Sequence, residues 1–184
     1  MSPDIKNAPN IFITGFMGSG KTTIGKEVAG HLGFEYLDID EIIENLTGKT
    51  INEIFQQNGE RFFRVLEKQV LSDCIQKKNI VVSLGGGTLI DPQNVAVVKQ
   101  SGILIHLSAE PGEIWERIKE TNKRPLLQKP DGLLVPEQEA IEHIEELLKV
   151  RQKGYNLADT VISTGNRNQD EVLMIILNYI AKLA

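Results

Sequence analysis

Residues 15–22, Gly-Phe-Met-Gly-Ser-Gly-Lys-Thr, match the phosphate-binding pattern G-x-x-x-x-G-K-[ST], and this match is the strongest indication of the fold. An apolar run at residues 10–13 precedes them, and Ile24, Val28 and Leu32 follow at the four-residue spacing of a helix. A loop between a strand and a helix can hold phosphate with its backbone N–H groups and with the helix N-terminus. The alternative is a glycine-rich turn with an incidental lysine, and the matched positions in this context argue against it.

The residues of this loop have separate predicted roles in binding a nucleoside triphosphate. Lys21 is expected to reach the β- and γ-phosphates, and Thr22 to give its hydroxyl to Mg²⁺. The residues predicted to bind ATP here are Gly18, Ser19, Gly20, Lys21, Thr22 and Thr23. The loop therefore predicts the phosphoryl donor and leaves the acceptor open.

The composition fits one globular domain in a reducing compartment. The 184 residues include 41% hydrophobic side chains, and the net charge of −5 argues against general binding to nucleic acid. Cys74 is the single cysteine, so no internal disulfide is expected, and we interpret it as a buried helix residue. There is no apolar run of about 18 residues and no signal-peptide pattern at the start. We therefore expect a cytoplasmic protein that contacts no membrane.

Apolar runs alternate with helical patterns along the rest of the chain. Further strands are expected at residues 34–37, 80–84, 103–107 and 160–163. Helical patterns are expected through residues 42–46 and again through 51–55, at about 60–77, from residue 92 onward, and at 111–120, 137–155 and 170–183. This alternation predicts an α/β fold with a parallel sheet covered on both faces. Residues 123–136 contain three prolines and show neither pattern. No linker is recognised, so residues 1–184 are expected to form a single domain, of which residues 1–8 are expected to be flexible.

Two aspartates, Asp38 and Asp40, follow the second predicted strand. Residues two apart on an extended chain point the same way, so both carboxylates are expected to face the phosphate site at the carboxyl edge of the sheet. One is suited to hold a water of Mg²⁺, and the other to accept a proton from a substrate hydroxyl. The alternative is that either one caps the helix that follows.

Three consecutive glycines, Gly85, Gly86 and Gly87, follow the third predicted strand. Because glycine loses the most chain entropy on folding, a triplet indicates that something approaches the backbone closely there. A tight turn is the alternative, although one or two glycines would serve for it. The strand before the triplet has no aspartate at its end, so a metal's second carboxylate has to come from elsewhere, which favours Asp38.

Three arginines are candidates for binding an anionic substrate. Arg64 has Glu67 one helical turn later, close enough for the carboxylate to orient the guanidinium. Arg151 falls on the apolar face of its predicted helix, where a cation needs an anionic partner unless its stem carries the charge to water at the helix end. Arg124 lies in the irregular segment, where a mobile loop can bring an arginine to the transferring phosphoryl group; an ordinary solvated charge is the alternative.

In their order and spacing, these motifs resemble the shikimate kinase family from residue 11 to about residue 180. The resemblance lies in GFMGSGKT at 15–22, DID at 38–40, FFRVLE at 62–67, LGGG at 84–87, RPLL at 124–127 and the helix with Arg151 and Tyr155. It implies a P-loop kinase fold with three α/β/α layers and a five-stranded parallel sheet in the order 2-3-1-4-5. It also implies a substrate-binding helical region at about residues 38–70 and a lid at about residues 123–136.

The resemblance further implies a role for each candidate residue. The residues implied to bind shikimate are Asp40, Arg64, Gly85, Gly86, Gly87 and Arg151. Arg64 and Arg151 would grip the carboxylate, and Asp40 would be the base for the 3-hydroxyl. Asp38 would hold Mg²⁺ through water, beside Thr22. The residues implied to act on the nucleotide side are the catalytic Lys21, the lid arginine Arg124, the adenine-stacking Arg117 and Arg167.

The implied reaction is Mg²⁺-dependent transfer of the γ-phosphoryl group of ATP to the 3-hydroxyl of shikimate, in aromatic amino acid biosynthesis. The resemblance implies a monomer. One alternative is another small-metabolite kinase of this fold, such as gluconate kinase, which has less use for two arginines and a glycine triplet around a carboxylated ring. Another is a nucleotide-sensing module without catalysis, which would have no reason to keep the acceptor residues.

Overall fold

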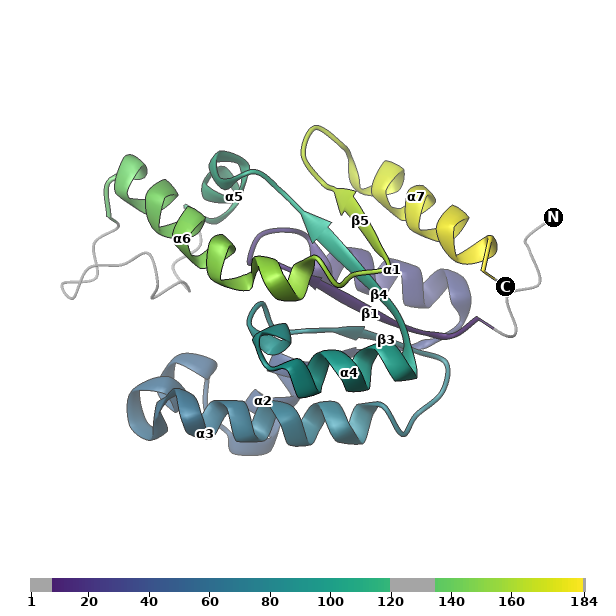
Figure 1. Ribbon diagram of the computed structural model, residues 1–184, viewed down its shortest axis with the longest axis horizontal. Helices are drawn as coiled ribbons and strands as arrows, with labels where there is room; N and C mark the ends of the chain where they lie inside the picture. The colour runs from purple at the N-terminus through teal and green to yellow at the C-terminus, as the bar shows by residue number, and fades with distance from the viewer. Residues whose placement is uncertain (1–7, 120–134, 184) are drawn as a thin grey trace.

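The computed structural model describes residues 8–119 and 135–183, which form a five-stranded parallel sheet with helices on both faces (Figure 1). The strands are β1 (Asn10–Gly15), β2 (Glu35–Asp38), β3 (Ile80–Ser83), β4 (Gly102–Ser108) and β5 (Thr160–Ser163). Their order is β2-β3-β1-β4-β5, as the family resemblance implied. Because each strand pair is parallel, all five strands end at the same edge of the sheet.

The helices form one layer on each face of this sheet. They are α1 (Lys21–Leu32), α2 (Ile39–Thr47), α3 (Ile51–Cys74), α4 (Pro92–Ser101), α5 (Pro111–Ile118), α6 (Glu137–Tyr155) and α7 (Gln169–Ala181), with a short 3₁₀ helix at Thr88–Ile90. In β1, Ile11 and Ile13 enter the core under α1 and α7, whereas Phe12 enters the core under α2, α3 and α4. Successive side chains of a strand point to opposite faces of the sheet, so the continuous apolar run of β1 contributes residues to the cores on both faces.

A third apolar cluster lies beyond the sheet, between the phosphate-binding loop and the helices α5 and α6. Phe16 of the loop packs there with Trp115 of α5 and Ile144 of α6. This packing brings α6 beside the loop, although more than 110 residues of chain separate them. Arg151, in the last part of α6, is thereby placed near the phosphate site.

The helix α3 differs from the sequence-based expectation. The helical patterns before and after residue 59 form one element that is broken at Gly59, where φ is 82° and ψ is 165°. A side chain is strained at this backbone conformation, so glycine suits the break. The second half of α3 carries Arg64 and ends at Cys74, three residues before the expected end. Cys74 is buried there, as predicted, and burial raises the pKa of its thiol to about 11.

Some predictions concern residues outside the described part of the chain. These are Arg124, most of the lid expected at residues 123–136, and residues 1–7. In the described ranges, no helix is both long and apolar enough to cross a membrane.

Candidate functional site

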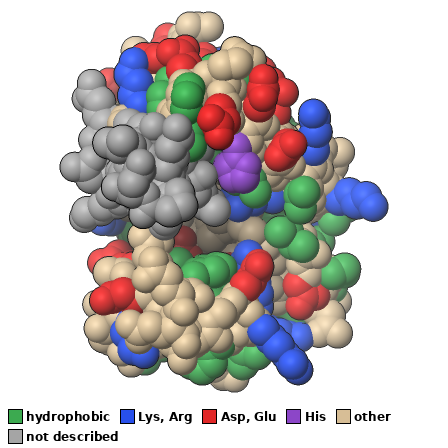
Figure 2. Space-filling model, turned by 90° about the vertical axis from the view of Figure 1, so that its left-hand side faces the viewer, with side chains coloured by type: hydrophobic (Ala, Val, Ile, Leu, Met, Phe, Trp, Pro, Cys, Tyr) green, Lys and Arg blue, Asp and Glu red, His purple; other side chains and the backbone are tan. Residues whose placement is uncertain are grey.

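The carboxyl edge of the sheet opens on a cavity of about 390 Å³. Figure 2 looks at this face of the molecule and shows a hollow in its middle. The cavity is lined, among others, by Lys21, Thr22, Asp38, Asp40, Phe55, Phe63, Arg64, Glu67, Gly85, Gly86, Gly87 and Arg151. Residues from five separate segments, among them those predicted to bind the phosphates and those predicted to bind the acceptor, therefore meet in one place.

The phosphate-binding loop has the backbone that its sequence predicts. Gly18 and Gly20 have φ angles of 76° and 90°, in the left-handed region that glycine adopts without strain. Gly20 is the N-cap of α1 and has no side chain to occupy the first N–H groups of that helix. Lys21 Nζ donates to the carbonyl oxygens of Gly15 at 2.9 Å and Phe16 at 3.0 Å. The ammonium group is therefore held against the loop, at the edge of the cavity.

Asp38 caps α2 and also faces the phosphate-binding loop. Its Oδ1 accepts hydrogen bonds from the backbone N–H groups of Asp40 at 3.1 Å and Glu41 at 3.4 Å. Its Oδ2 accepts from the hydroxyl groups of Thr22 at 3.3 Å and Tyr36 at 3.0 Å. The capping role is thus confirmed for Asp38, and it leaves the second oxygen directed at Thr22. Tyr36, which the sequence did not single out, helps to fix that oxygen.

Asp40 lies in the first turn of α2, so the extended backbone that we expected between the two aspartates is wrong. Its carboxylate nevertheless lines the same cavity as Asp38. Burial raises the pKa of Asp40 from 3.8 to about 6, and the charge of Asp38 adds to this effect, whereas Lys21 opposes it. A carboxylate with this pKa is a stronger base than an ordinary aspartate and is still mostly ionised at about pH 7.

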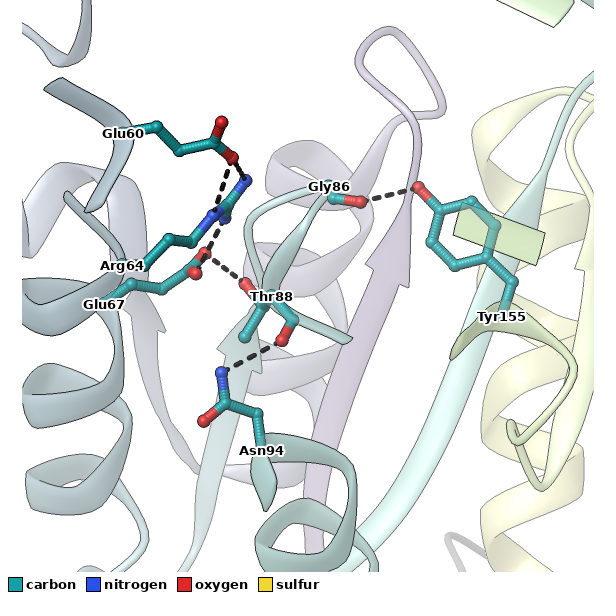
Figure 3. A network of polar contacts seen from close by, with 7 residues as sticks. All are labelled: Glu60, Arg64, Glu67, Gly86, Thr88, Asn94 and Tyr155. Atoms are coloured by element: carbon teal, nitrogen blue, oxygen red, sulfur yellow. Dashed lines mark hydrogen bonds and ion pairs between the residues drawn. The ribbon is translucent and has the colours of Figure 1, made fainter. Parts of the chain in front are cut away.

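Arg64 is held by two carboxylates of its own helix (Figure 3). Its Nη1 donates to Glu67 Oε2 at 2.8 Å, and its Nη2 donates to Glu60 Oε1 at 3.0 Å. Burial acts to lower the pKa of the guanidinium, but the two carboxylates outweigh this effect and raise the pKa. The predicted pairing with Glu67 is therefore confirmed. Glu60 was missed, although it lies four residues before Arg64, where a helix also brings side chains together.

Arg151 reaches the cavity from α6. Its guanidinium lies over the ring of Phe16, 4.8 Å from the centroid. Within residues 8–119 and 135–183, no carboxylate pairs with it. One turn later the buried Tyr155 donates from its hydroxyl to the carbonyl of Gly86 at 3.0 Å (Figure 3). The ring of Tyr155 stacks on that of His106. Tyr155 therefore ties the end of α6 to the glycine triplet.

The glycine triplet leaves room for both guanidinium groups. A Cβ atom on Gly86 would lie 2.7 Å from Arg151 Nη1, and one on Gly87 would lie 2.6 Å from Arg64 Nη2. Both distances are shorter than a non-bonded contact allows, so any other residue would displace the arginine. At Gly86 and Gly87, the close approach that the triplet predicts is therefore made by the two arginine side chains.

A second cavity, of about 860 Å³, lies between the phosphate-binding loop, α5 and the segment after β5. Arg117 of α5 lines it and donates to the carbonyl of Gly18 at 3.2 Å and to the hydroxyl of Thr164 at 2.9 Å. Arg167 lines the same cavity and donates to the carbonyl of Ser163 at 2.7 Å. Thr164, which fixes Arg117, was missed because nothing in its sequence context distinguishes it from an ordinary loop threonine.

Two aromatic residues of α3 were also missed as part of the site. Phe55 and Phe63 line the first cavity, with their ring centroids 4.9 Å apart. They give it an apolar wall on the side of Arg64. The signal available in the sequence was their position within a helix that also carries the candidate arginine, but apolar helix residues usually belong to a core.

A family model described as shikimate kinase matches residues 17–181. The chain belongs to the shikimate kinase family. The shikimate kinase of Caldanaerobacter subterraneus subsp. tengcongensis is 38% identical over 95% of this chain and 97% of its own length. That of Chlorobaculum tepidum is 42% identical over 89% of this chain and 85% of its own. The structure of a shikimate kinase from Acinetobacter baumannii in complex with shikimate has a TM-score of 0.88 and 34% identity, covering 100% of this chain and 98% of that one.

Family membership confirms the function expected from the motifs. The protein is an ATP-dependent phosphotransferase with the function of a shikimate kinase. The three-layer kinase fold and the strand order implied by the resemblance are confirmed as well. Neither the gluconate kinase nor the nucleotide-sensing alternative is favoured by these relatives.

Proposed function

We propose that shikimate binds in the first cavity, with its carboxylate between Arg64 and Arg151 and its 3-hydroxyl facing Asp40. The observation that carries this proposal is that these three side chains, from α3, α6 and α2, line one cavity beside the phosphate-binding loop. A hydroxylated ring acid calls for cations at its carboxylate and a base at its reacting hydroxyl. Shikimate is also the ligand of the related Acinetobacter baumannii structure.

The two arginines bind the carboxylate in different ways. Arg151 has no carboxylate partner in the described part of the chain, so its charge is available to a ligand. Arg64 shares its charge with Glu67, which orients the guanidinium. A planar guanidinium can form two parallel hydrogen bonds with a carboxylate, which a lysine cannot do. The triplet of Gly85, Gly86 and Gly87 then forms the floor against which the ring lies.

Gly87→Ala is expected to raise the KM for shikimate about tenfold, with a much smaller change in stability. The added methyl group would lie 2.6 Å from Arg64 Nη2. The end of an arginine can move away with little loss of stability, but it then leaves the position that binds the carboxylate. The measurements are steady-state KM values for both substrates and a thermal melt.

The matched control for this variant is Gly112→Ala in α5, where an added Cβ atom meets nothing within 4 Å. The control should leave both KM values unchanged. A Gly87→Ala enzyme with an unaltered KM for shikimate would contradict the proposed place of the substrate carboxylate.

Asp40 is the proposed base for the phosphoryl transfer. It accepts the proton of the 3-hydroxyl as that oxygen bonds to the γ-phosphorus of ATP and the bond from this phosphorus to the β,γ-bridging oxygen breaks, which releases ADP. The raised pKa of Asp40 increases its affinity for this proton. Lys21 is proposed to stabilise the negative charge on the transferring group. We also propose that Arg124, which lies outside the described residues, contacts the phosphates from a lid at about residues 123–136.

Thr22 and Asp38 form a donor set that fits Mg²⁺. The Thr22 hydroxyl donates to Asp38 Oδ2 at 3.3 Å, so the two side-chain oxygens lie together beside the loop. Among the described residues no cluster of three or more His, Cys, Asp or Glu side chains could hold a metal. Mg²⁺ suits such a sparse site, because it keeps several waters and takes its other ligands from substrate phosphates. When bound, the ion neutralises charge on the β- and γ-phosphates.

The nucleotide is proposed to span both cavities. Its phosphates lie on the loop, and its base lies in the second cavity beside Arg117 and Arg167. The residues proposed to contact ATP are Gly18, Ser19, Gly20, Lys21, Thr22, Thr23, Arg117, Arg124 and Arg167. We further propose a cytoplasmic monomer, in line with the single cysteine and the family resemblance.

The test of the proposed function is a coupled assay of ADP release with shikimate, gluconate and nucleoside monophosphates as acceptors. Shikimate alone should support turnover, and removal of Mg²⁺ with a chelator should abolish it. Turnover with gluconate or a nucleoside monophosphate in place of shikimate would overturn the substrate assignment. ATP binding without turnover on any acceptor would overturn catalysis altogether.

A further inference from the structure

Behind Arg64, a buried chain of hydrogen bonds continues past Glu67 (Figure 3). Glu67 is 1% exposed, and its two oxygens have different partners. Oε2 accepts from Arg64 at 2.8 Å, and Oε1 accepts from the hydroxyl of Thr88 at 2.6 Å. The carbonyl of Thr88 in turn accepts from Asn94 Nδ2 at 3.0 Å. The chain therefore runs from the start of α4 through the 3₁₀ helix to the guanidinium in the cavity.

The hydrogen bond from Thr88 is of a strong kind. A hydroxyl that donates to an ionised carboxylate forms a shorter and stronger bond than two neutral groups do. Thr88 is completely buried, so no water competes for this bond. A buried carboxylate is costly unless both oxygens are hydrogen-bonded, and the last torsion of a glutamate has no sharp preference of its own. The hydroxyl of Thr88 therefore sets the plane of the Glu67 carboxylate.

The orientation of the Glu67 carboxylate matters because a second carboxylate, that of Glu60, also binds the Arg64 guanidinium. Glu60 is 65% exposed and accepts from both Nη2 and Nε of Arg64. Glu67 holds the guanidinium against the glycine triplet, whereas Glu60 draws it toward solvent. If the Glu67 carboxylate rotated, its hydrogen bond to Arg64 would be lost, and the guanidinium could move away from the cavity together with Glu60.

We propose that Thr88 is a positioning residue for the substrate carboxylate: its hydroxyl fixes Glu67 and, through Glu67, the guanidinium of Arg64. The inference rests on the proposed role of Arg64 in binding shikimate. Thr88 lies behind Glu67 and does not line the cavity, so it acts without touching the substrate. Asn94 supports it by holding the backbone of the 3₁₀ helix.

The first test replaces the hydroxyl by a methyl group of the same size. Thr88→Val should raise the KM for shikimate about tenfold, while kcat and the KM for ATP stay within about twofold. Thr88→Ser keeps the hydroxyl and should restore the KM. The matched control is Thr14→Val, because Thr14 is equally buried and its hydroxyl has no partner in the described part of the chain. A thermal melt of each variant checks folding.

The second test asks whether Thr88 acts through Arg64. In an Arg64→Lys background, which keeps a charge beside Glu67 but loses the planar fork, Thr88→Val should add less than about a twofold change in KM. A full tenfold effect in that background would overturn the proposal. An unchanged KM for shikimate in Thr88→Val alone would also overturn it. The same holds if Thr88→Val and Thr88→Ser have equal KM values for shikimate.

Failure of the proposed carboxylate site and failure of the proposed role of Thr88 give different kinetic results. If Arg64→Lys alone leaves the KM for shikimate unchanged, the proposed carboxylate site is wrong. If Arg64→Lys raises the KM but Thr88→Val does not, the site stands and the role of Thr88 is overturned. Should Thr88→Val fail to fold, Thr88→Ala and Thr88→Ser give the same comparison, because they differ only by the hydroxyl.

Discussion

Asp40→Asn is expected to lower kcat by about 10²- to 10⁴-fold, the range that a general base contributes. The amide has the size and shape of the carboxylate and should occupy the same place in the first turn of α2. It cannot accept the proton of the attacking hydroxyl. The KM for ATP should stay within about twofold, because the phosphate-binding loop is untouched. Steady-state kinetics with each substrate varied in turn measures both effects.

The pH profile gives this prediction a second readout. Asp40 has to be ionised to act as a base, and its pKa is about 6. The kcat/KM for shikimate should therefore rise with pH up to about 6 and level off above it. The residual activity of Asp40→Asn should lack this acid limb. The control is Glu41→Gln, an exposed acid on the same turn, which should keep both the rate and the limb. Near-normal turnover in Asp40→Asn would contradict the assignment of the base.

The stability of Asp40→Asn should change in the opposite direction to its activity. The folded-state pKa of Asp40 is raised from 3.8 to about 6, so this carboxyl group destabilises the free protein increasingly as the pH rises above 3.8, and fully above about 6. Removing the charge should stabilise the fold by up to about 3 kcal/mol at neutral pH and by nothing below the unfolded pKa. A higher melting temperature together with lost turnover would show that the activity is lost because the base is missing and not because the fold is damaged.

Arg151→Ala is expected to raise the KM for shikimate about 30-fold or more. Removing one partner of a buried, hydrogen-bonded charge pair costs roughly 2–5 kcal/mol, and 2 kcal/mol corresponds to about 30-fold in affinity. Arg151 gives a cleaner experiment than Arg64. Loss of Arg64 would leave the buried Glu67 without its cation, whereas Arg151 has no such partner in the described chain. The change should therefore appear in substrate binding and not in folding.

Isothermal titration with shikimate and steady-state kinetics both measure this effect. Arg61→Ala is the matched control, because Arg61 lies exposed on α3, three residues before Arg64. Arg151→Lys should fall between the wild type and Arg151→Ala, since it keeps the charge and loses the planar fork. An unchanged affinity for shikimate in Arg151→Ala would mean that the carboxylate binds elsewhere.

Much of the fold could be predicted because its signals are local. The bounds of α6 and β5 agree with the expected ranges of 137–155 and 160–163. Periodicity and terminal signals lie within a few residues of each boundary, so the sequence carries them directly. The prediction failed between Asp38 and Asp40, where extended backbone was expected. There Asp38 caps a helix that begins at the next residue, and the local cap prevailed over the strand pattern.

The nucleotide end of the site could be predicted from the amino-acid sequence. The phosphate-binding loop is a contiguous motif, so its glycines, its lysine and the helix that follows are sufficient to define its geometry. The family also followed from the order of motifs along the chain. In both cases the signal can be recognised along the sequence without knowing which residues meet in space.

The arrangement of the acceptor end, in contrast, depends on contacts between segments that are distant in the sequence. Arg64 and Arg151 come from helices on different parts of the chain, and only packing brings them against Gly87 and Gly86. The same holds for Thr88, whose contact with Glu67 spans 21 residues and leaves no local pattern. Burial then raises the pKa of Asp40, an effect of the assembled surroundings that no residue type carries by itself.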